Sequence, residues 1–94
     1  MNKRTKIIGT LGPATESETT IHAMIVAGMD LARLNFSHGT HKEHRTHIDN
    51  LKKVREELDL PIGIILDTKG PCVRTGLLQN EGPVKLYAGK QLVL

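Results

Sequence analysis

Three short apolar runs alternate with two longer segments in which apolar residues recur at helical spacing. The runs cover residues 6–11 (KIIGTL), 29–36 (MDLARLNF) and 62–66 (IGIIL), and each has the length and composition of a strand. The intervening segments each place apolar side chains on one helical face: Ile21, Met24 and Ile25 in the first, and Ile48, Leu51, Val54 and Leu58 in the second. This order predicts an α/β protein with a parallel sheet and right-handed helical connections.

The ends of both predicted helices carry sequence signals. Thr15-x-x-Glu18 and Thr40-x-x-Glu43 have the capping-box pattern, in which each side chain bonds a free amide at a helix start. Gly28 is placed to end the first helix, and Leu60-Pro61 to end the second. The rest of the second helix is expected to be charged and solvated.

The residue composition of the chain changes after Asp67, where glycine and proline become frequent. Two Gly-Pro pairs and two single glycines then flank short segments at residues 72–75, 84–87 and 91–94, which predict a small antiparallel β region. We therefore expect one unit over residues 1–69 and the beginning of a second over residues 70–94. The sequence stops within an apolar strand pattern, which we expect of a truncated chain.

Composition narrows the class of protein. Ninety-four residues suffice for one small domain, and the aromatic residues Phe36 and Tyr87 are few for an independent core. The net charge is +3, but lysine and arginine do not cluster in a long run, so we expect no nucleic-acid partner. Apolar runs are too short for a membrane span, and the single cysteine, Cys72, suits a reducing cytoplasm.

The second apolar run carries the strongest candidate for chemistry. Alternation along a strand places Arg33, Asn35 and Ser37 on one face, and Leu34 and Phe36 on the other. In a barrel the apolar pair would face the helices, and the polar residues would face the interior and its carboxyl-terminal mouth. Two partners for the arginine remain open: a phosphate that accepts two hydrogen bonds, or an acidic residue of another strand.

Asp67 and Thr68 end the third strand at the same mouth. Together with Asn35 and Ser37 they offer only oxygen donors and one formal negative charge, which suits a monovalent hard cation. The alternative is that Asp67 caps the following turn while Asn35 and Ser37 bond to the backbone.

Three further features have two interpretations each. Arg74 either approaches the same anion or is a solvated hinge residue, and Cys72 is either a redox-sensitive thiol or an unreactive one. His38, His41, His44 and His47 recur at every third position, and because this spacing drifts around a helix they predict a polar face rather than a metal site.

The motifs together resemble those of the pyruvate kinase family. The resemblance covers essentially the whole chain and rests on three segments in order: TLGPAT at residues 10–15, GMDLARLNFSHG at residues 28–39, and LDTKGP at residues 66–71 with Arg74-Thr75-Gly76. It implies the first three β/α units of a (β/α)8 TIM-type barrel over residues 1–69, and the start of an inserted antiparallel β domain over residues 70–94. It also implies phosphoryl transfer from phosphoenolpyruvate to ADP, giving pyruvate and ATP.

The resemblance assigns roles residue by residue. It implies that Arg33 and Arg74 contact the transferring phosphate as catalytic residues, and that Pro13 and His38 lie beside the nucleotide. It implies a potassium ion held by Asn35, Ser37, Asp67 and Thr68. Mg²⁺ or Mn²⁺ is implied as well, with ligands outside this chain, so we expect the chain alone to be inactive. The parent is expected to be a cytoplasmic homotetramer.

Two departures and two rival functions complete the expectations. Cys72 stands where the family usually has a glutamate, and Glu43 where many relatives have a nucleotide-contacting side chain. The rivals are another barrel enzyme that acts on phosphoenolpyruvate-like acids, and a non-catalytic module that binds a partner.

Overall fold

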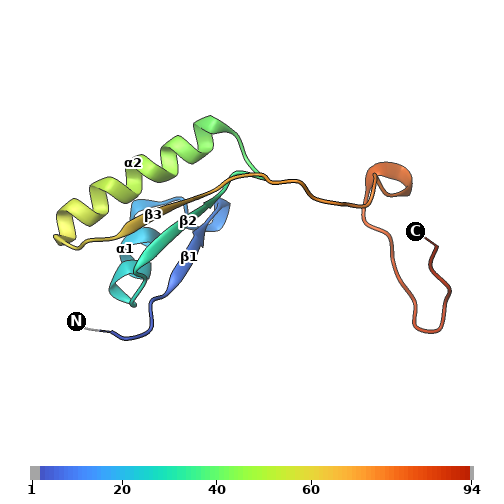
Figure 1. Ribbon diagram of the computed structural model, residues 1–94, viewed down its shortest axis with the longest axis horizontal. Coiled ribbons are helices and arrows are strands. Elements are labelled where there is room, and N and C mark those ends of the chain that lie inside the picture. Colours follow the sequence, from blue (N-terminus) through green and yellow to red (C-terminus); the bar gives the residue numbers. More distant parts are fainter. Residues whose placement is uncertain (1–2, 94) are drawn as a thin grey trace.

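A computed structural model describes residues 3–93 of the chain as a three-stranded sheet covered on one face by two helices, followed by an extended segment (Figure 1). The strands are β1 (Ile8–Leu11), β2 (Leu31–Asn35) and β3 (Gly63–Asp67), and the helices are α1 (Glu18–Val26) and α2 (His41–Leu58). All five elements were predicted, with bounds that differ by one to a few residues.

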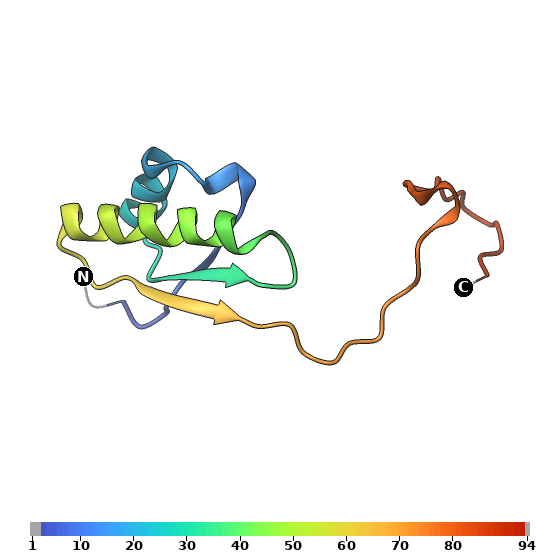
Figure 2. The same cartoon turned by 90° about the horizontal axis from the view of Figure 1, so that it is seen from above.

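The sheet is parallel and its strands follow the order β1-β2-β3. Thr10 pairs with Arg33, which pairs with Ile65, and Asn35 pairs with Asp67. All three strands therefore end at the same edge, as expected for a parallel sheet. Both helices lie on one side of the sheet, as the view from above shows (Figure 2).

The hydrophobic core lies between the sheet and the helices. Burial alternates along β2, where Ala32 and Leu34 are buried and Leu31, Arg33 and Asn35 are not. The removal of apolar side chains from water, on the strand faces that pack against the helices, is the main stabilising contribution to this arrangement. The core consists of Leu11, Ile21, Ile25, Met29, Ala32, Leu34, Leu51, Val54 and Ile62.

The capping box predicted for α2 is present, whereas the one predicted for α1 is wrong. At α2 the Glu43 N–H donates to Thr40 Oγ1, and the Thr40 N–H donates to Glu43 Oε2 at 2.6 Å. Before α1, Thr15 ends a short 3₁₀ helix, and Ser17 caps the α-helix instead. Pro13 begins that 3₁₀ turn, and Thr15 accepts from the Gly12 N–H, so the hydroxyl is already engaged.

The prediction of a polar face carrying the histidines of α2 is wrong for two of them. His44 and His47 are only 7% and 5% exposed. His47 lies four positions before Leu51, and His44 lies seven positions before it, so both belong to the same helical stripe and extend the apolar face toward the helix start. The ring of His44 stacks on Phe36 with centroids 4.3 Å apart.

A polar contact ties the start of the chain to the other end of the sheet. Asp30 precedes β2 and accepts hydrogen bonds at 2.8 Å from the Lys3 ammonium and from the Ile7 N–H. The Lys3 contact, followed by the Ile7 amide, lowers the pKa of the Asp30 carboxyl. This contact lies at the amino ends of the strands, opposite the edge where the predicted site residues gather.

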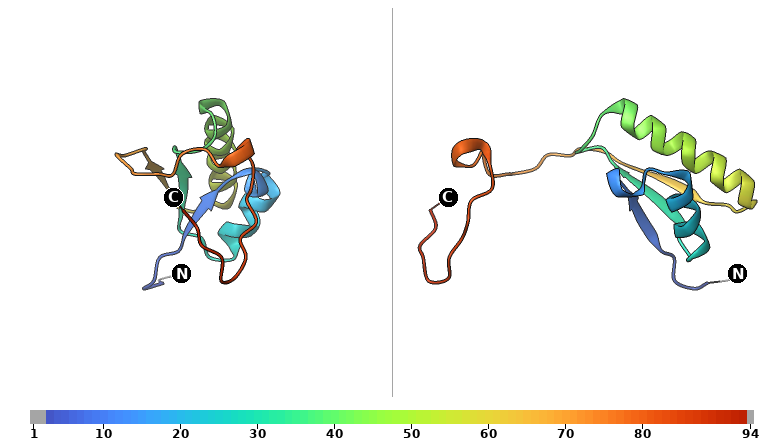
Figure 3. Two further views of the ribbon diagram at one scale, coloured as in Figure 1. Left: turned by 90° about the vertical axis from the view of Figure 1, so that its right-hand side faces the viewer. Right: turned by 180° about the vertical axis from the view of Figure 1, so that it is seen from behind.

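Residues 68–93 contain no strand, so the antiparallel strands predicted at residues 72–75 and 84–87 are not formed. The third predicted strand, 91–94, likewise has none at residues 91–93, and residue 94 lies outside the described residues. The segment holds one 3₁₀ turn, Gln79–Glu81, and leaves the sheet as an extended chain (Figure 3). Short strands need partners and an apolar surface to pack on, and this segment contacts neither the sheet nor the helices extensively.

Candidate functional site at the carboxyl ends of the strands

Arg33 is the centre of a polar cluster that extends to the carboxyl ends of β2 and β3. It lies in the middle of β2 on the face away from the helices, because the neighbouring Ala32 and Leu34 occupy the core face. Its side chain is 32% exposed. The guanidinium reaches toward both neighbouring strands.

The guanidinium of Arg33 contacts one side chain on each neighbouring strand. Its Nε donates to Asp67 Oδ2 at 2.9 Å, and its Nη2 donates to the same oxygen. On the other side, Nη1 donates to Thr10 Oγ1 at 3.0 Å. An acidic residue of another strand, one of the two partners left open for Arg33, is therefore present.

Asn35 and Asp67 lie opposite each other at the ends of their strands. The Phe36 N–H donates to the Asp67 carbonyl at 2.9 Å and continues the ladder past β2. Asn35 Oδ1 accepts from the Ser37 N–H at 3.1 Å, which is one of the backbone bonds considered as an alternative to a cation site. Because a carbonyl oxygen has two lone pairs, Asn35 Oδ1 can accept this hydrogen bond and still be a ligand of a cation.

A buried histidine holds the loop between β2 and α2. His44 Nε2 and the His38 carbonyl oxygen lie 2.7 Å apart and form a hydrogen bond. Gly39 has a φ of +75°, and a Cβ there would stand 3.2 Å from Glu43 Oε2 and 3.3 Å from His44 Nε2. The loop is therefore tightly constrained, while the side chains of Ser37 and His38 stay exposed.

The remaining predicted site residues are less closely gathered. Pro13 follows β1 at the same edge of the sheet and is exposed, as is Thr68 directly after β3. Arg74 is exposed too, and it makes no hydrogen bond or ion pair with any described residue. Cys72 is exposed, and its Sγ contacts the Gly70 carbonyl at 3.6 Å. The structure thus joins Arg33, Asn35 and Asp67 and leaves Arg74 apart.

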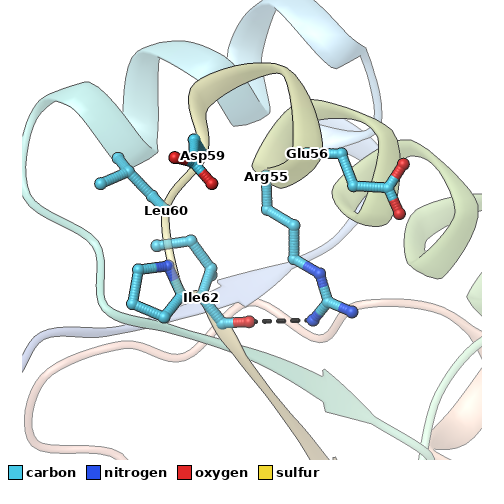
Figure 4. A pocket seen from close by; sticks show the side chains of 6 residues that line it. Arg55, Glu56, Asp59, Leu60 and Ile62 are labelled. Carbon is cyan, nitrogen blue, oxygen red and sulfur yellow. Dashed lines mark hydrogen bonds between the residues drawn. The ribbon is translucent and has the colours of Figure 1, made fainter.

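The cleft of about 350 Å³ drawn in Figure 4 lies away from this cluster. It is formed where α2 turns into β3, at the amino ends of the strands, and Arg55 there donates to the Ile62 carbonyl at 3.0 Å. Within residues 3–93, histidine, cysteine and acidic side chains form no group suited to a metal. No helix in that range is long and apolar enough to cross a membrane.

Thr10 is the residue of this cluster that the sequence interpretation missed. It was noted only as part of a motif, although the alternation of KIIGTL places it on the face opposite Leu11, as Arg33 lies opposite Leu34. A register between the two strands would have been needed to pair it with Arg33. Local alternation gives the face of a residue and not its partner in the next strand.

A parallel sheet with helices on one face and polar residues at its carboxyl edge defines a β/α-repeat protein of the kind found in α/β barrels. Residues 2–94 match the family described as pyruvate kinase, barrel domain. The chain belongs to the pyruvate kinase family.

Individual relatives agree with this assignment. The pyruvate kinases of Staphylococcus haemolyticus and Staphylococcus aureus are each 48% identical over 92 residues. The match covers 98% of this chain and 16% of each relative. A crystal structure of a pyruvate kinase from Cryptosporidium parvum is similar with a TM-score of 0.73 at 42% identity, over 81% of this chain and 16% of that one. The chain thus spans about a sixth of the length of these relatives.

Proposed function

We propose that this chain supplies the first three β/α units of a (β/α)8 barrel that transfers a phosphoryl group from phosphoenolpyruvate to ADP, giving pyruvate and ATP. Membership of the family supports the activity, and the arginine held at the carboxyl edge of the sheet is the observation that carries it. Residues 1–69 would belong to the barrel, and residues 70–94 would begin the inserted antiparallel β domain.

Arg33 would bind the oxygens of the transferring phosphoryl group. A guanidinium has five N–H donors, and three of those on Arg33 are used by Asp67 and Thr10, which leaves two without a partner among residues 3–93. Two donors suffice for a bidentate contact with a phosphate. Phosphoryl transfer depends mainly on positioning and on neutralising charge, and both are what a fixed guanidinium provides.

Arg74 would be a second phosphate contact. Its exposed position in the segment after β3 leaves it apart from Arg33, so this role requires residues 68–93 to be drawn toward the sheet in the complete protein. Pro13 and His38 would lie beside the nucleotide, since both follow strands at the same edge.

The residues at this edge fit the potassium ion that the family implies. Asn35, Ser37, Asp67 and Thr68 offer amide, hydroxyl, carboxylate and carbonyl oxygens, and Asn35 and Asp67 are direct partners in the sheet. The Asp67 side chain is 46% exposed, and its second carboxylate oxygen is not engaged by Arg33. Oxygen donors with one negative charge suit a hard monovalent cation, which would add positive charge beside the phosphate.

The chemistry also requires Mg²⁺ or Mn²⁺, whose ligands we place on later strands. Without those ligands the chain alone is expected to be inactive. We further propose that the complete protein is a cytoplasmic homotetramer without nucleic-acid or membrane partners.

A chimera tests the proposed activity. The matching segment of the Staphylococcus haemolyticus enzyme would be replaced by residues 1–94 of this chain, and pyruvate release would be followed with saturating Mg²⁺ and K⁺. We expect turnover within about tenfold of the parent enzyme, since the segments are 48% identical. A matched chimera with Arg33→Ala should be inactive.

The same experiment separates the rival functions. A folded chimera that does not turn over phosphoenolpyruvate would contradict the proposed activity and favour a non-catalytic module. Turnover of related acids in preference to phosphoenolpyruvate would favour another barrel enzyme.

A further inference from the structure

The hydrogen bond between Thr10 and Arg33 gives Thr10 a place in the site that goes beyond the residues assigned so far. Thr10 lies on β1, directly beside Arg33 in the sheet, and its Oγ1 accepts from Nη1 at 3.0 Å. The residue is exposed and contributes nothing to the core. Its hydroxyl therefore serves no packing role in the described structure.

The contact with Asp67 alone does not fix the plane of the guanidinium. Nε and Nη2 both donate to one oxygen atom, Oδ2, so the guanidinium can still rotate about this single acceptor. The carboxylate is nearly half exposed, and ion pairs of that kind hold a side chain weakly. A second fixed point is needed to define the orientation.

Thr10 provides that second point from the opposite side. Because β2 lies between β1 and β3, Thr10 and Asp67 flank the guanidinium on its two edges. The planar fork then keeps two N–H groups, one on Nη1 and one on Nη2, that have no partner among residues 3–93. These are the donors that a phosphate oxygen pair would use.

We propose that Thr10 is a positioning residue, whose hydroxyl holds the Arg33 fork in the orientation that receives the phosphoryl group. The inference rests on the proposed function, because it assumes that Arg33 meets that phosphate. It assigns no direct contact between Thr10 and the substrate.

Three variants of the chimera test this role. Thr10→Val keeps the shape and removes the hydroxyl, and we expect it to lower kcat and kcat/KM for phosphoenolpyruvate by about 10- to 100-fold. Thr10→Ser restores the hydroxyl and should recover most of the loss. Thr46→Val is the matched control, because it also removes one hydroxyl bond, to the Lys42 carbonyl at 3.1 Å, but on the outer face of α2.

Thermal unfolding and binding separate this inference from simpler causes. Thr10→Val should unfold at the temperature of the parent chimera, since valine keeps the volume of threonine and Thr10 lies outside the core between the sheet and the helices. Binding of phosphoenolpyruvate, measured by calorimetry, should weaken in Thr10→Val and recover in Thr10→Ser, whether or not the chimera turns over.

The possible outcomes decide between the two proposals. Thr10-dependent binding in an inactive chimera would support the positioning role and contradict the proposed activity. Parent-like kinetics and binding in Thr10→Val, or an equal loss in Thr10→Ser, would overturn the positioning role alone. A folded chimera that neither turns over nor binds phosphoenolpyruvate would overturn both.

Discussion

At the scale of single residues, Arg33 shows how an ion pair can matter more for orientation than for stability. Its side chain and that of Asp67 are 32% and 46% exposed, and pairs so open to solvent contribute about 0–1 kcal/mol to folding. The same pair restricts a long, flexible side chain to one region of the sheet edge. Preorganised donors of this kind act by being in place before charge develops.

Replacing Arg33 by lysine tests the need for the fork. Lysine keeps the charge but cannot make a bidentate contact while also bonding Asp67 and Thr10. In the chimera, Arg33→Lys should lower kcat and kcat/KM together by about 100-fold, which corresponds to about 2.7 kcal/mol. Steady-state kinetics would measure this, and values near those of the parent would contradict the role given to Arg33.

Asn35→Ala should respond to potassium. The change removes an oxygen donor from the edge where Asn35 pairs with Asp67, so the cation site should weaken. Part of the lost activity should return at high K⁺, whereas the defect of Arg33→Lys should not. A potassium titration of both variants measures the difference, and a defect in Asn35→Ala that ignores potassium would count against the cation site.

At the scale of elements, α2 has an unusual buried face. Its first half buries His44 and His47 where a helix of this kind would normally bury aliphatic side chains. His44 has a stacking partner in Phe36 and a hydrogen bond to the His38 carbonyl, whereas neither ring nitrogen of His47 has a partner among residues 3–93. The two histidines therefore differ in what they contribute.

Leucine at each position should act in opposite directions. His47→Leu removes two unpaired buried polar atoms at similar volume and should stabilise the chain by about 1 kcal/mol. His44→Leu removes the bond that holds the loop and should destabilise it by about 1–3 kcal/mol. Thermal unfolding at one fixed protein concentration compares them, and equal effects of the two substitutions would contradict this account.

The contact between Lys3 and Asp30 predicts a defined acid sensitivity. Because the folded-state pKa of Asp30 lies below its ordinary value of 3.8, the contact stabilises the fold above that pH and is lost as pH falls through the folded pKa. Asp30→Asn should therefore lower the Tm at pH 7, and the difference from the parent should shrink below pH 3.8. A difference that persists at acid pH would show that the carboxylate charge is not responsible.

The elements were largely predictable, and the partners within the site were not. The alternation of apolar and polar residues in MDLARLNF predicted the two faces of β2, because a strand with one buried face places apolar residues at every second position. The burial of His44 and His47 was not predicted, because their polar side chains were given more weight than their helical spacing with Leu51. The pairing of Arg33 with Thr10 and Asp67 depends on register across three strands, which no local pattern contains.

At the scale of the whole molecule, much apolar surface is left uncovered. The radius of gyration is 17.9 Å, whereas a compact chain of this length would have about 12 Å. Ile8 and Leu66 on the outer strands are more than half exposed, as are Val73, Leu77 and Leu86 in the extended segment. Both outer strands also have an unpaired edge within the described residues.

We expect the isolated chain to associate. Unpaired edges and exposed apolar side chains favour contacts between copies. Sedimentation over a range of concentrations should show oligomers or aggregates, and Leu77→Glu combined with Leu86→Glu should reduce them, because both side chains are exposed. A cooperatively folded monomer at high concentration would contradict the prediction.

The order of strands in the sheet has a consequence for synthesis on the ribosome. β2 pairs with β1, which precedes it in the chain, and β3 is added to β2 afterwards, so β1, α1 and β2 can assemble once Asn35 has emerged. The about 28 further residues needed to reach Gly63 take roughly 1–6 s to translate, whereas a helix forms within about a microsecond. α2 is itself translated in this interval, so it can cover Leu34 only once Leu58 has emerged, while β2 keeps a free edge until β3 follows. The order of strands in the sheet is thus the order of their synthesis, so each new strand can pair with a strand that has already been translated.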